Sequence, residues 1–245
     1  MSDELVNFNV LSGIRIMHIH HFELVEGARH ATGLTVVIDV FRAFSTVCYL
    51  YGQGAEKVLA AATPEDAFAF RKQDPRVILA GERQEKKITG FDFGNSPSEV
   101  LKHDLTGRTV VLTTSAGTLG LVSAGNASGL LTGSLVNAGA IVQYIRQKNP
   151  ETVSLVAMGY NAVIPADEDR MCARYIEAKL MKSQVRPDLM EQSIRNGTGS
   201  RFFDPENLNS PEEDYHLCLD IDRFPFVLVC EKSNKYLFLK KIDMP

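Results

Sequence analysis

Short apolar runs rich in β-branched residues alternate along the chain with amphipathic stretches. The runs predict strands over residues 34–40, 76–80, 108–114, 128–134 and 152–158, and the stretches predict helices over 64–73, 97–103, 118–125, 137–148 and 168–182. Strands that are apolar on both faces and alternate with helices are typical of a largely parallel sheet covered on both sides. The pattern therefore predicts an α/β fold with three layers, α/β/α, around a largely parallel or mixed central sheet.

Two further apolar runs near the C-terminus, "FPFVLVCEK" and "KYLFLKK", flank the pair Ser233-Asn234. This arrangement predicts an antiparallel β-hairpin appended to the core. The polar stretch 196–209 predicts a long loop. Because no repeat or low-complexity linker interrupts the chain, we expect residues 1–245 to form a single domain.

Three sites combine a hydroxyl residue, a proline and an acid in the order typical of a helix start. Thr63, Ser96 and Ser210 are the predicted N-caps of these helices. Because the same pattern begins two other predicted helices, its copy at Ser96 by itself indicates a helix start and does not indicate a ligand-binding residue.

Composition narrows the classes of function. The chain has 245 residues, 26 Lys plus Arg and 30 Asp plus Glu, so its formal charge is −4. This balance offers no basic excess for nucleic acid or an anionic membrane, and we expect neither as a partner. The four cysteines lack Cys-x-x-Cys spacing, the acidic start 1–10 does not resemble a secretory signal, and no apolar stretch reaches the ~20 residues of a membrane helix. We therefore expect a soluble, cytoplasmic protein with reduced thiols.

Polar residues gather where the predicted strands end, which is where open α/β sheets bind ligands. They are Asp39, Arg42, Ser45 and Thr46 after the first strand, Glu82 and Arg83 after the second, Thr114, Ser115, Gly117 and Thr118 after the third, Asn137 after the fourth, and Asp167, Glu168 and Asp169 after the fifth.

This mixture suits a phosphate ester and a hard cation. A guanidinium such as Arg42, hydroxyl groups and free backbone N–H groups at a helix start bind a phosphate dianion. Carboxylates such as those of Asp39, Glu82 and Asp169 suit Mg²⁺, which offsets charge and activates water during ester hydrolysis. The strand ends therefore predict a magnesium-dependent phosphate site.

Structural interpretations of the same residues stay open. Asp39 and Arg42 can form an ion pair that closes a strand, and Glu82-Arg83 can be a solvated turn. The acids at 167–169 favour the positive end of the helix that they begin, and 115–118 can be a small-residue turn without a ligand. His18 and His20 lie on one face of a strand, where they are either metal ligands or surface histidines.

The order of several motifs resembles the 2-phosphosulfolactate phosphatase family. The motifs are Asp39-x-x-Arg42-Ala43, "AGER", "GFDFGNSP", "TTSAGT", "GSLVNA" and Glu168-Asp169, and the match runs from about Val36 to "YHLCLDID". The resemblance implies an α/β/α fold and a Mg²⁺-dependent phosphatase that acts on a phosphate ester of a small 2-hydroxy acid in coenzyme M biosynthesis.

The resemblance also implies roles for individual residues. Asp39, Glu82 and Asp169 look like metal-side acids, with Glu168 as a helper, and Asp39, Arg42, Glu82 and Arg83 form the catalytic group. The remaining matches look like phosphate or substrate contacts: Ser45, Asn95, Ser96, Thr114, Ser115, Gly117, Thr118 and Asn137.

Three departures from the family's pattern lie on the substrate side. Ala116 and Phe44 stand where the family usually has Asn and Thr, and "GYNAVIPADEDR" replaces a glycine-rich turn around Gly159. The sequence thus predicts phosphatase chemistry more firmly than the substrate. Arg83, Lys86, Lys87, Arg170 and Arg174 are candidates for binding an acid group of the substrate.

Two other functions compete with this prediction. A haloacid-dehalogenase-like phosphatase would also use an Asp after its first strand, but it needs an acid two residues later, where Phe41 cannot transfer a proton. A phospho-ligand-binding protein without turnover would share the fold. Whether water or a side chain attacks phosphorus, and whether the chain forms a homodimer, stay open.

Overall fold

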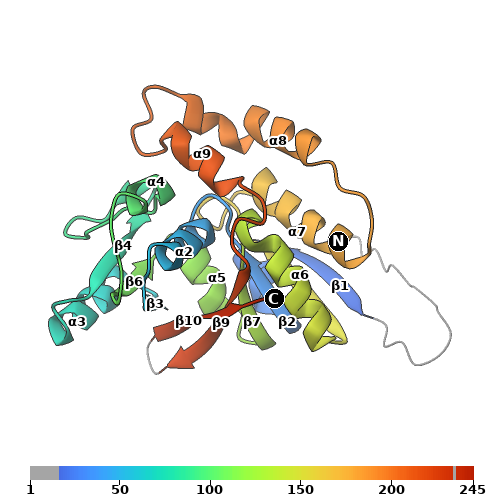
Figure 1. Ribbon diagram of the computed structural model, residues 1–245, viewed down its shortest axis with the longest axis horizontal. Coiled ribbons are helices and arrows are strands. Elements are labelled where there is room, and N and C mark those ends of the chain that lie inside the picture. Colours follow the sequence, from blue (N-terminus) through green and yellow to red (C-terminus); the bar gives the residue numbers. More distant parts are fainter. Residues whose placement is uncertain (1–16, 234–235) are drawn as a thin grey trace.

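The computed structural model describes residues 17–233 and 236–245, and in this part of the chain ten strands form one sheet (Figure 1). Their order across the sheet is β1-β8-β2-β7-β9-β10-β3-β6-β4-β5. The strands are β1 (His18–Glu23), β2 (Gly33–Ile38), β3 (Lys57–Ala60), β4 (Ile78–Arg83), β5 (Lys86–Lys87), β6 (Thr109–Thr113), β7 (Ala127–Gly133), β8 (Thr152–Ala157), β9 (Phe226–Ser233) and β10 (Tyr236–Asp243).

Helices connect most of these strands and cover the sheet. They are α1 (Leu24–His30), α2 (Ala43–Gly52), α3 (Pro64–Gln73), α4 (Pro97–Val100), α5 (Gly117–Ser123), α6 (Ala138–Lys148), α7 (Asp167–Leu180), α8 (Pro187–Asn196) and α9 (Glu212–Cys218), with 3₁₀ turns η1 (Leu135–Asn137) and η2 (Thr198–Phe203). The predicted α/β fold with a mostly parallel sheet is thus confirmed.

The C-terminal hairpin forms the middle of the sheet. β9 and β10 pair antiparallel with each other, β9 pairs with β7, and β10 pairs with β3. The hairpin therefore joins a parallel block of β1, β8, β2 and β7 to a second parallel block of β3, β6 and β4 (Figure 1). A hairpin was correctly predicted, but its expected position as an appendage was wrong. Asn234 of the predicted turn lies outside the described residues.

Three antiparallel steps separate the two blocks, so their parallel strands run in opposite directions. The carboxyl ends of β2 and β8 therefore do not share a sheet edge with those of β4 and β6. The polar residues predicted at five strand ends are thus divided between opposite edges of the sheet.

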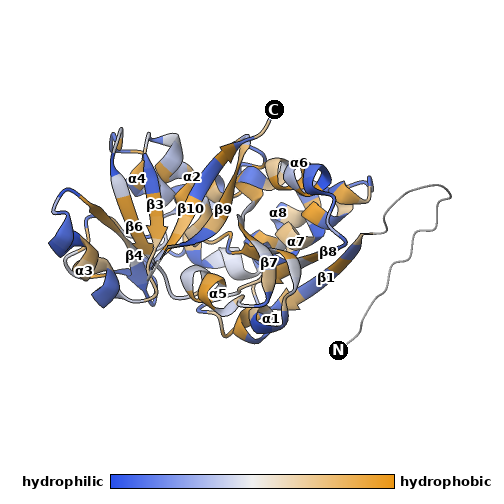
Figure 2. Cartoon of the chain, turned by 90° about the horizontal axis from the view of Figure 1, so that it is seen from below, coloured by the Kyte–Doolittle hydropathy of each residue, from blue (hydrophilic) through white to orange (hydrophobic). Residues whose placement is uncertain are grey.

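Both faces of the sheet are apolar and covered by helices. On β2, Val36 and Ile38 pack in one core with residues of α6 and α7, whereas Val37 packs in another with residues of α1, α2 and α5. Alternation of side chains along a strand explains this division. Apolar residues accordingly concentrate in the strands (Figure 2).

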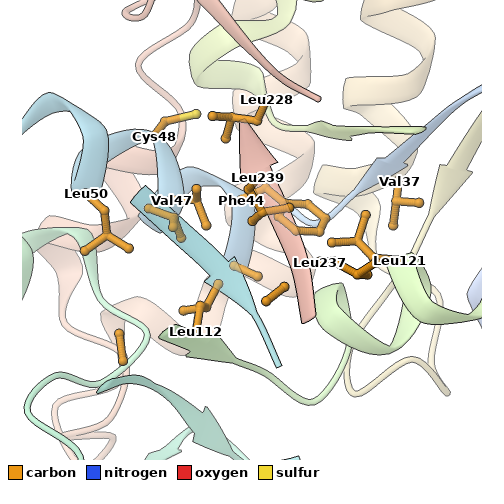
Figure 3. Close-up of a cluster of buried hydrophobic side chains, with 14 of the residues drawn as sticks. Val37, Phe44, Val47, Cys48, Leu50, Leu112, Leu121, Leu228, Leu237 and Leu239 are labelled. Carbon is orange, nitrogen blue, oxygen red and sulfur yellow. The ribbon is translucent and has the colours of Figure 1, made fainter. Parts of the chain in front are cut away.

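Helix α2 carries the core that unites the two blocks. Its side chains Phe44, Val47 and Leu50 are fully buried and belong to one cluster with Leu112 of β6 and Leu239 of the hairpin (Figure 3). The residues of α2 are buried on nearly every side, which fits its apolar sequence AFSTVCYLY.

Several predicted elements differ from those observed. The strand β3 and the helices α1, α2 and α8 lie in segments for which no element was predicted, and η2 forms within the expected loop 196–209. Thr63 and Ser96 accept hydrogen bonds from the N–H groups of Asp66 and Glu99, as N-caps do. The predicted cap at Ser210 is wrong, because α9 begins at Glu212 with Pro211 at its N-cap position.

The four cysteines carry free thiols, as the lack of paired spacing predicted. Among the helices of the described residues, none combines the length and apolar character that crossing a membrane requires.

Candidate active site

A small cavity of about 30 Å³ brings Asp39 together with Glu82. Its lining residues are Asp39, Phe41, Arg42, Glu82, Glu85, Asn95, Ser115, Ala116, Gly159, Tyr160, Asn161 and Arg201. A larger, open hollow of about 460 Å³ lies elsewhere, between residues 52–54 and 101–106. Only the smaller cavity contains residues from the predicted site, so we regard it as the candidate active site.

Two helices bring the strand ends of both blocks to this cavity. The chain leaves β2 at Asp39, enters α2 and continues to β3 in the other block. After β6, the turn 114–116 leads into α5, which packs against α1 and β2 of the first block. The candidate site therefore forms where the chain crosses between blocks.

Asp39 is held at the start of α2. The Ala43 N–H donates to its Oδ1 atom over 3.1 Å, and the carboxyl group is almost completely buried. Gly117, the first residue of α5, lies so close that a Cβ atom there would be 3.0 Å from Asp39 Oδ2 and 2.8 Å from the Cβ of Ala43. A residue without a side chain is therefore needed to bring α5 beside Asp39.

Glu82 is fixed by the turn that follows β6 and by its own hairpin. The Ser115 N–H donates to Glu82 Oε1 over 2.7 Å, and Ser115 Oγ lies 3.0 Å from Oε2. The N–H of Glu85 donates to Oε2 over 3.0 Å. The preceding Gly81 has φ of +146°, and a Cβ atom there would lie 2.0 Å from the Thr113 carbonyl oxygen, so glycine is required for β4 to approach β6.

The two late acids lie behind the cavity wall. Asp169 accepts hydrogen bonds from the N–H groups of Val40, over 2.7 Å, and Gly159, over 2.8 Å, and thereby ties α7 to the loops after β2 and β8. Glu168 accepts a hydrogen bond from the Thr198 hydroxyl group. Neither acid lines the cavity.

Within residues 17–233 and 236–245, no three His, Cys, Asp or Glu side chains are grouped in a way that would hold a metal ion. Asp39 and Glu82, however, share the cavity. Mg²⁺ is commonly bound by one or two carboxylates together with substrate phosphate and water. This pair therefore fits a magnesium ion that is completed by a ligand, rather than one enclosed by protein groups alone.

The site concentrates negative charge in a buried place. Burial, together with repulsion from the nearby carboxylates of Glu82 and Glu168, raises the pKa of Asp39 to about 7 against the hydrogen bonds from Ala43 and Gly117. Burial also raises the pKa of Asp169, with added repulsion from Glu168 and Asp39. The pKa of Glu168 is raised by burial, although Arg201 opposes this effect. Such a cluster favours either protons or a bound cation.

Arg42 lines the cavity, but its guanidinium group already has partners. Its Nη1 donates to Asp214 Oδ2 over 2.6 Å, and its Nη2 donates to the carbonyl oxygen of Asn209 over 2.8 Å. Asp214 also accepts hydrogen bonds from Ser96 Oγ and the Ser98 N–H. The alternative of a structural ion pair thus applies to Arg42 with Asp214 as its partner rather than Asp39.

Other predicted site residues make local structural contacts outside the cavity lining. Ser45 Oγ bonds to the Val40 carbonyl oxygen, Thr114 and Thr118 bond to each other, and Asn137 bonds to the Phe226 carbonyl oxygen. Arg83 donates to Thr113 Oγ1 over 2.8 Å. These contacts position the turns of the site, and their predicted roles as substrate contacts stay predictions.

His18 and His20 on β1 do not line the cavity, and neither does the neighbouring His21. β1 forms as the pattern predicted, and His21 pairs with Glu177 at 3.0 Å. The described part of the chain offers no third ligand for a metal bound by these histidines.

Arg170, a candidate for binding an acid group of the substrate, pairs with Glu23 on the surface.

Asn95 has an unused acceptor at the cavity. The side chain is 7% exposed, and its Oδ1 atom is buried without a hydrogen-bond partner. A buried amide oxygen without a partner is costly and calls for a donor. A bound ligand or its water would supply one, which agrees with the predicted role of Asn95 in substrate binding.

Sequence reasoning missed several cavity residues, above all Arg201. This residue belongs to η2, in a segment that was expected to be a loop. Glu85, from the turn between β4 and β5, was missed as well, whereas Tyr160 and Asn161 belong to the segment GYNAVIPADEDR, which the sequence placed on the substrate side. The positions of Arg201 and Glu85 follow from how the segments cross in space, and no spacing signal in the sequence points to these two residues.

A family model described as 2-phosphosulpholactate phosphatase matches residues 19–233, which include every cavity residue. The chain is a member of the 2-phosphosulpholactate phosphatase family. The resemblance inferred from the motifs is thereby confirmed, and membership places the chain among phosphoric monoester hydrolases.

Three relatives, each named probable 2-phosphosulfolactate phosphatase, illustrate the similarity within this family. The Bacillus subtilis protein is 28% identical over 94% of this chain and 98% of its own length. The Caldanaerobacter subterraneus subsp. tengcongensis protein is 37% identical over 78% and 85%, respectively. The Clostridium perfringens protein is 36% identical over 62% of each chain, so that alignment spans less than two thirds of the relative.

Proposed function

We propose that this protein hydrolyses the phosphate monoester of a small 2-hydroxy acid, 2-phosphosulfolactate first among them, with Mg²⁺ as cofactor. The family supports the phosphatase chemistry, and the names of the relatives support this substrate. The observation that carries the proposal is that Asp39 and Glu82, from the two different blocks, line one buried cavity.

The excess of carboxylates supports Mg²⁺. Asp39, Glu82 and Glu85 line the cavity and Glu168 and Asp169 lie behind it, so an ionised site carries repulsion that a divalent cation would relieve. Asp39 and Glu82 would hold the ion directly, and Glu168 and Asp169 would add their charge to the site. Mg²⁺ would supply positive charge to the phosphoryl oxygens and lower the pKa of a bound water.

The residues of the chain divide the remaining tasks. Ser115 holds the Glu82 carboxylate through both its N–H and its hydroxyl, and Gly117 allows α5 to approach Asp39. Asn95 offers an acceptor to a hydroxyl group or a water of the ligand. Arg42 keeps the segment that contains Asn209 and Asp214 beside the cavity.

The cavity volume of about 30 Å³ has room for about two water molecules and is too small for a phosphate ester. Substrate binding therefore requires that side chains of the wall move. Arg201 and Glu85 belong to this wall, and their side chains are partly exposed, at 19% and 21%. Arg201 Nε lies 3.0 Å from Glu85 Oε1.

Phosphate release tests the proposal. Purified protein is incubated with 2-phosphosulfolactate or 2-phospholactate, with Mg²⁺ or with a chelator, and inorganic phosphate is measured. We expect release only with Mg²⁺, and we expect Asp39→Asn to abolish it while circular dichroism shows an intact fold. Asp74→Asn is the control, because Asp74 is a surface acid paired with Arg76. Release that is unaffected by the chelator would contradict the cofactor.

The same experiment separates the two competing functions. Binding of the ester without phosphate release would indicate a binding protein. A covalent phosphate trapped on Asp39 would indicate attack by the side chain, as in haloacid-dehalogenase-like enzymes. Phe41, two residues later, packs against Phe202 with ring centres 4.7 Å apart and offers no acid for that mechanism. A cytoplasmic location, a role in coenzyme M biosynthesis and a homodimer stay predictions.

A further inference from the structure

Arg201 is held at the cavity by aromatic rings, and its charge also acts on the buried carboxyl group of Glu168. Its guanidinium carbon lies 5.6 Å from the ring centre of Phe41, 5.5 Å from that of Tyr160 and 5.0 Å from that of Phe202. Its Nη1 donates to the Thr198 carbonyl oxygen over 3.0 Å. Its Nη2 donates to the Phe41 carbonyl oxygen over 3.5 Å. The rings and these two carbonyl oxygens hold the guanidinium group and leave its remaining N–H groups for an anion.

Among the described residues, no carboxylate makes an aligned hydrogen bond to Arg201. Its Nε atom lies 3.0 Å from Glu85 Oε1, yet this N–H is buried without an aligned hydrogen bond. Among the described residues that line the cavity, Arg42 and Arg201 are the cations, and Arg42 is paired with fully buried Asp214. Arg201 is therefore the cation at the cavity that can exchange its partner at low cost.

Glu85 occupies its place through an unfavourable backbone. The pair Gln84-Glu85 joins β4 to β5 with φ angles of +52° and +65°, and a type I′ turn likewise has positive φ at both central residues. Such turns favour Asn-Gly, and two long side chains in this conformation are strained. Strain that is retained beside a cavity suggests that the Glu85 carboxylate serves that cavity.

We propose that Arg201 binds the acid group of the substrate, the carboxylate or sulfonate beside the phosphate ester, and that this group replaces Glu85 as the partner of Arg201. The proposal rests on the proposed function and names the residue that distinguishes acidic esters from other phosphate esters. In the unliganded protein Glu85 neutralises Arg201 and closes the cavity. An entering acid releases Glu85 and opens the same space.

The test compares two esters that differ in one charge, 2-phospholactate and its methyl ester. We expect the wild-type protein to hydrolyse the acid with the higher kcat/KM. Arg201→Met should lower kcat/KM for the acid by about 10- to 100-fold, the range for a lost charge-assisted hydrogen bond, and leave that for the methyl ester within about 3-fold. The ratio of the two values does not depend on how much of the preparation is folded.

Arg223→Met is the matched control. Arg223 also stacks on two rings, Tyr49 and Phe224, and pairs with Asp220, but it does not line the cavity. This variant should keep the wild-type ratio between the two esters. An equal change of the ratio in both variants would overturn the assignment of Arg201.

Glu85→Gln tests the exchange of partners. Without the competing carboxylate, KM for 2-phospholactate should fall by a larger factor than KM for the methyl ester. A rise of KM as large as in Arg201→Met would show that Glu85 supports substrate binding and would overturn the exchange. If wild-type protein releases phosphate from neither ester, the proposed function fails and the assignment fails with it. If the wild-type protein hydrolyses both esters and Arg201→Met keeps the wild-type ratio of their kcat/KM values, only the assignment of Arg201 fails.

Discussion

At the scale of single residues, the ion pair between Arg42 and Asp214 holds the segment that contains Asn209 and Asp214 beside the cavity. Both side chains are buried, with 5% and 0% exposure, and they join α2 to the segment before and within α9. Removing one partner of such a pair leaves a buried charge without compensation.

We therefore expect Arg42→Met to lower the free energy of unfolding by about 3–5 kcal/mol in urea titrations. Arg76→Met is the control, because its partner Asp74 is on the surface and such pairs contribute about 0–1 kcal/mol. The double variant Arg42→Met/Asp214→Asn should recover part of the loss. A loss below about 1 kcal/mol for Arg42→Met would contradict the structural role of the pair.

The sequence identified Arg42 but not its partner. The motif around Asp39 singles out Asp39 and Arg42. The partner of Arg42, Asp214, lies 172 positions later in a helix whose first turn is rich in acids. Nothing in the local pattern distinguishes Asp214 from Glu212 or Glu213. Likewise, the polar segment 196–209 gives no sign that Arg201 folds back onto Phe41 and Tyr160. Such contacts depend on packing between distant segments.

At the scale of elements, the first turn of α5 must pack directly against Asp39. Gly117→Ala would place a methyl group 2.8 Å from the Cβ of Ala43 and 3.0 Å from Asp39 Oδ2. We expect it to cost about 1–3 kcal/mol of stability and to reduce phosphate release more strongly than its stability loss explains.

Gly125→Ala is the matched control for this variant. Gly125 follows the same helix, and a Cβ atom there would meet nothing within 4 Å. Its unfolding free energy and its kcat should stay near the wild-type values. Wild-type kinetics in Gly117→Ala would show that the approach of α5 to Asp39 does not matter for catalysis.

Strand positions were largely predictable, but strand order was not. Apolar runs located β2, β4, β6, β7 and β8 because both faces of these strands are buried. The place of the hairpin depends instead on pairing between residues about 100 to 180 positions apart, such as Leu131 with Val229 and Leu237 with Ala60. Local periodicity carries no information about such pairing.

At the scale of the whole molecule, the central hairpin should make both blocks unfold together. Leu239 of β10 is fully buried in the core that includes α2 and strands of both blocks. We expect Leu239→Ala to cost about 2–5 kcal/mol while unfolding remains a single transition by circular dichroism and by tyrosine fluorescence. Leu208→Ala, at an 89% exposed position, should be neutral. Two separate transitions would contradict the joining role of the hairpin.

The buried acids should also make stability depend on pH. The pKa of Asp39 rises from 3.8 to about 7, so between these values the folded protein holds a proton that the unfolded chain has lost. Stability of the metal-free protein should therefore fall as pH rises from about 4 to about 7, and the raised pKa values of Glu168 and Asp169 act in the same direction.

Urea titrations at pH 5 and pH 7.5, without metal, measure this effect. Asp39→Asn should lose less stability between the two pH values than the wild-type protein, because the amide does not ionise. Added Mg²⁺ should stabilise the wild-type protein more at pH 7.5 than at pH 5. Stability that rises with pH over this window in the metal-free protein would contradict the raised pKa values.

Calorimetric titration with Mg²⁺ tests the central claim most directly, namely that Asp39 and Glu82 hold one divalent cation between the two blocks. The account predicts a single site in the wild-type protein, release of protons on binding near pH 6.5, and affinity at least tenfold weaker in Asp39→Asn and in Glu82→Gln than in the control Asp74→Asn. Equal Mg²⁺ affinity in all four proteins would contradict it.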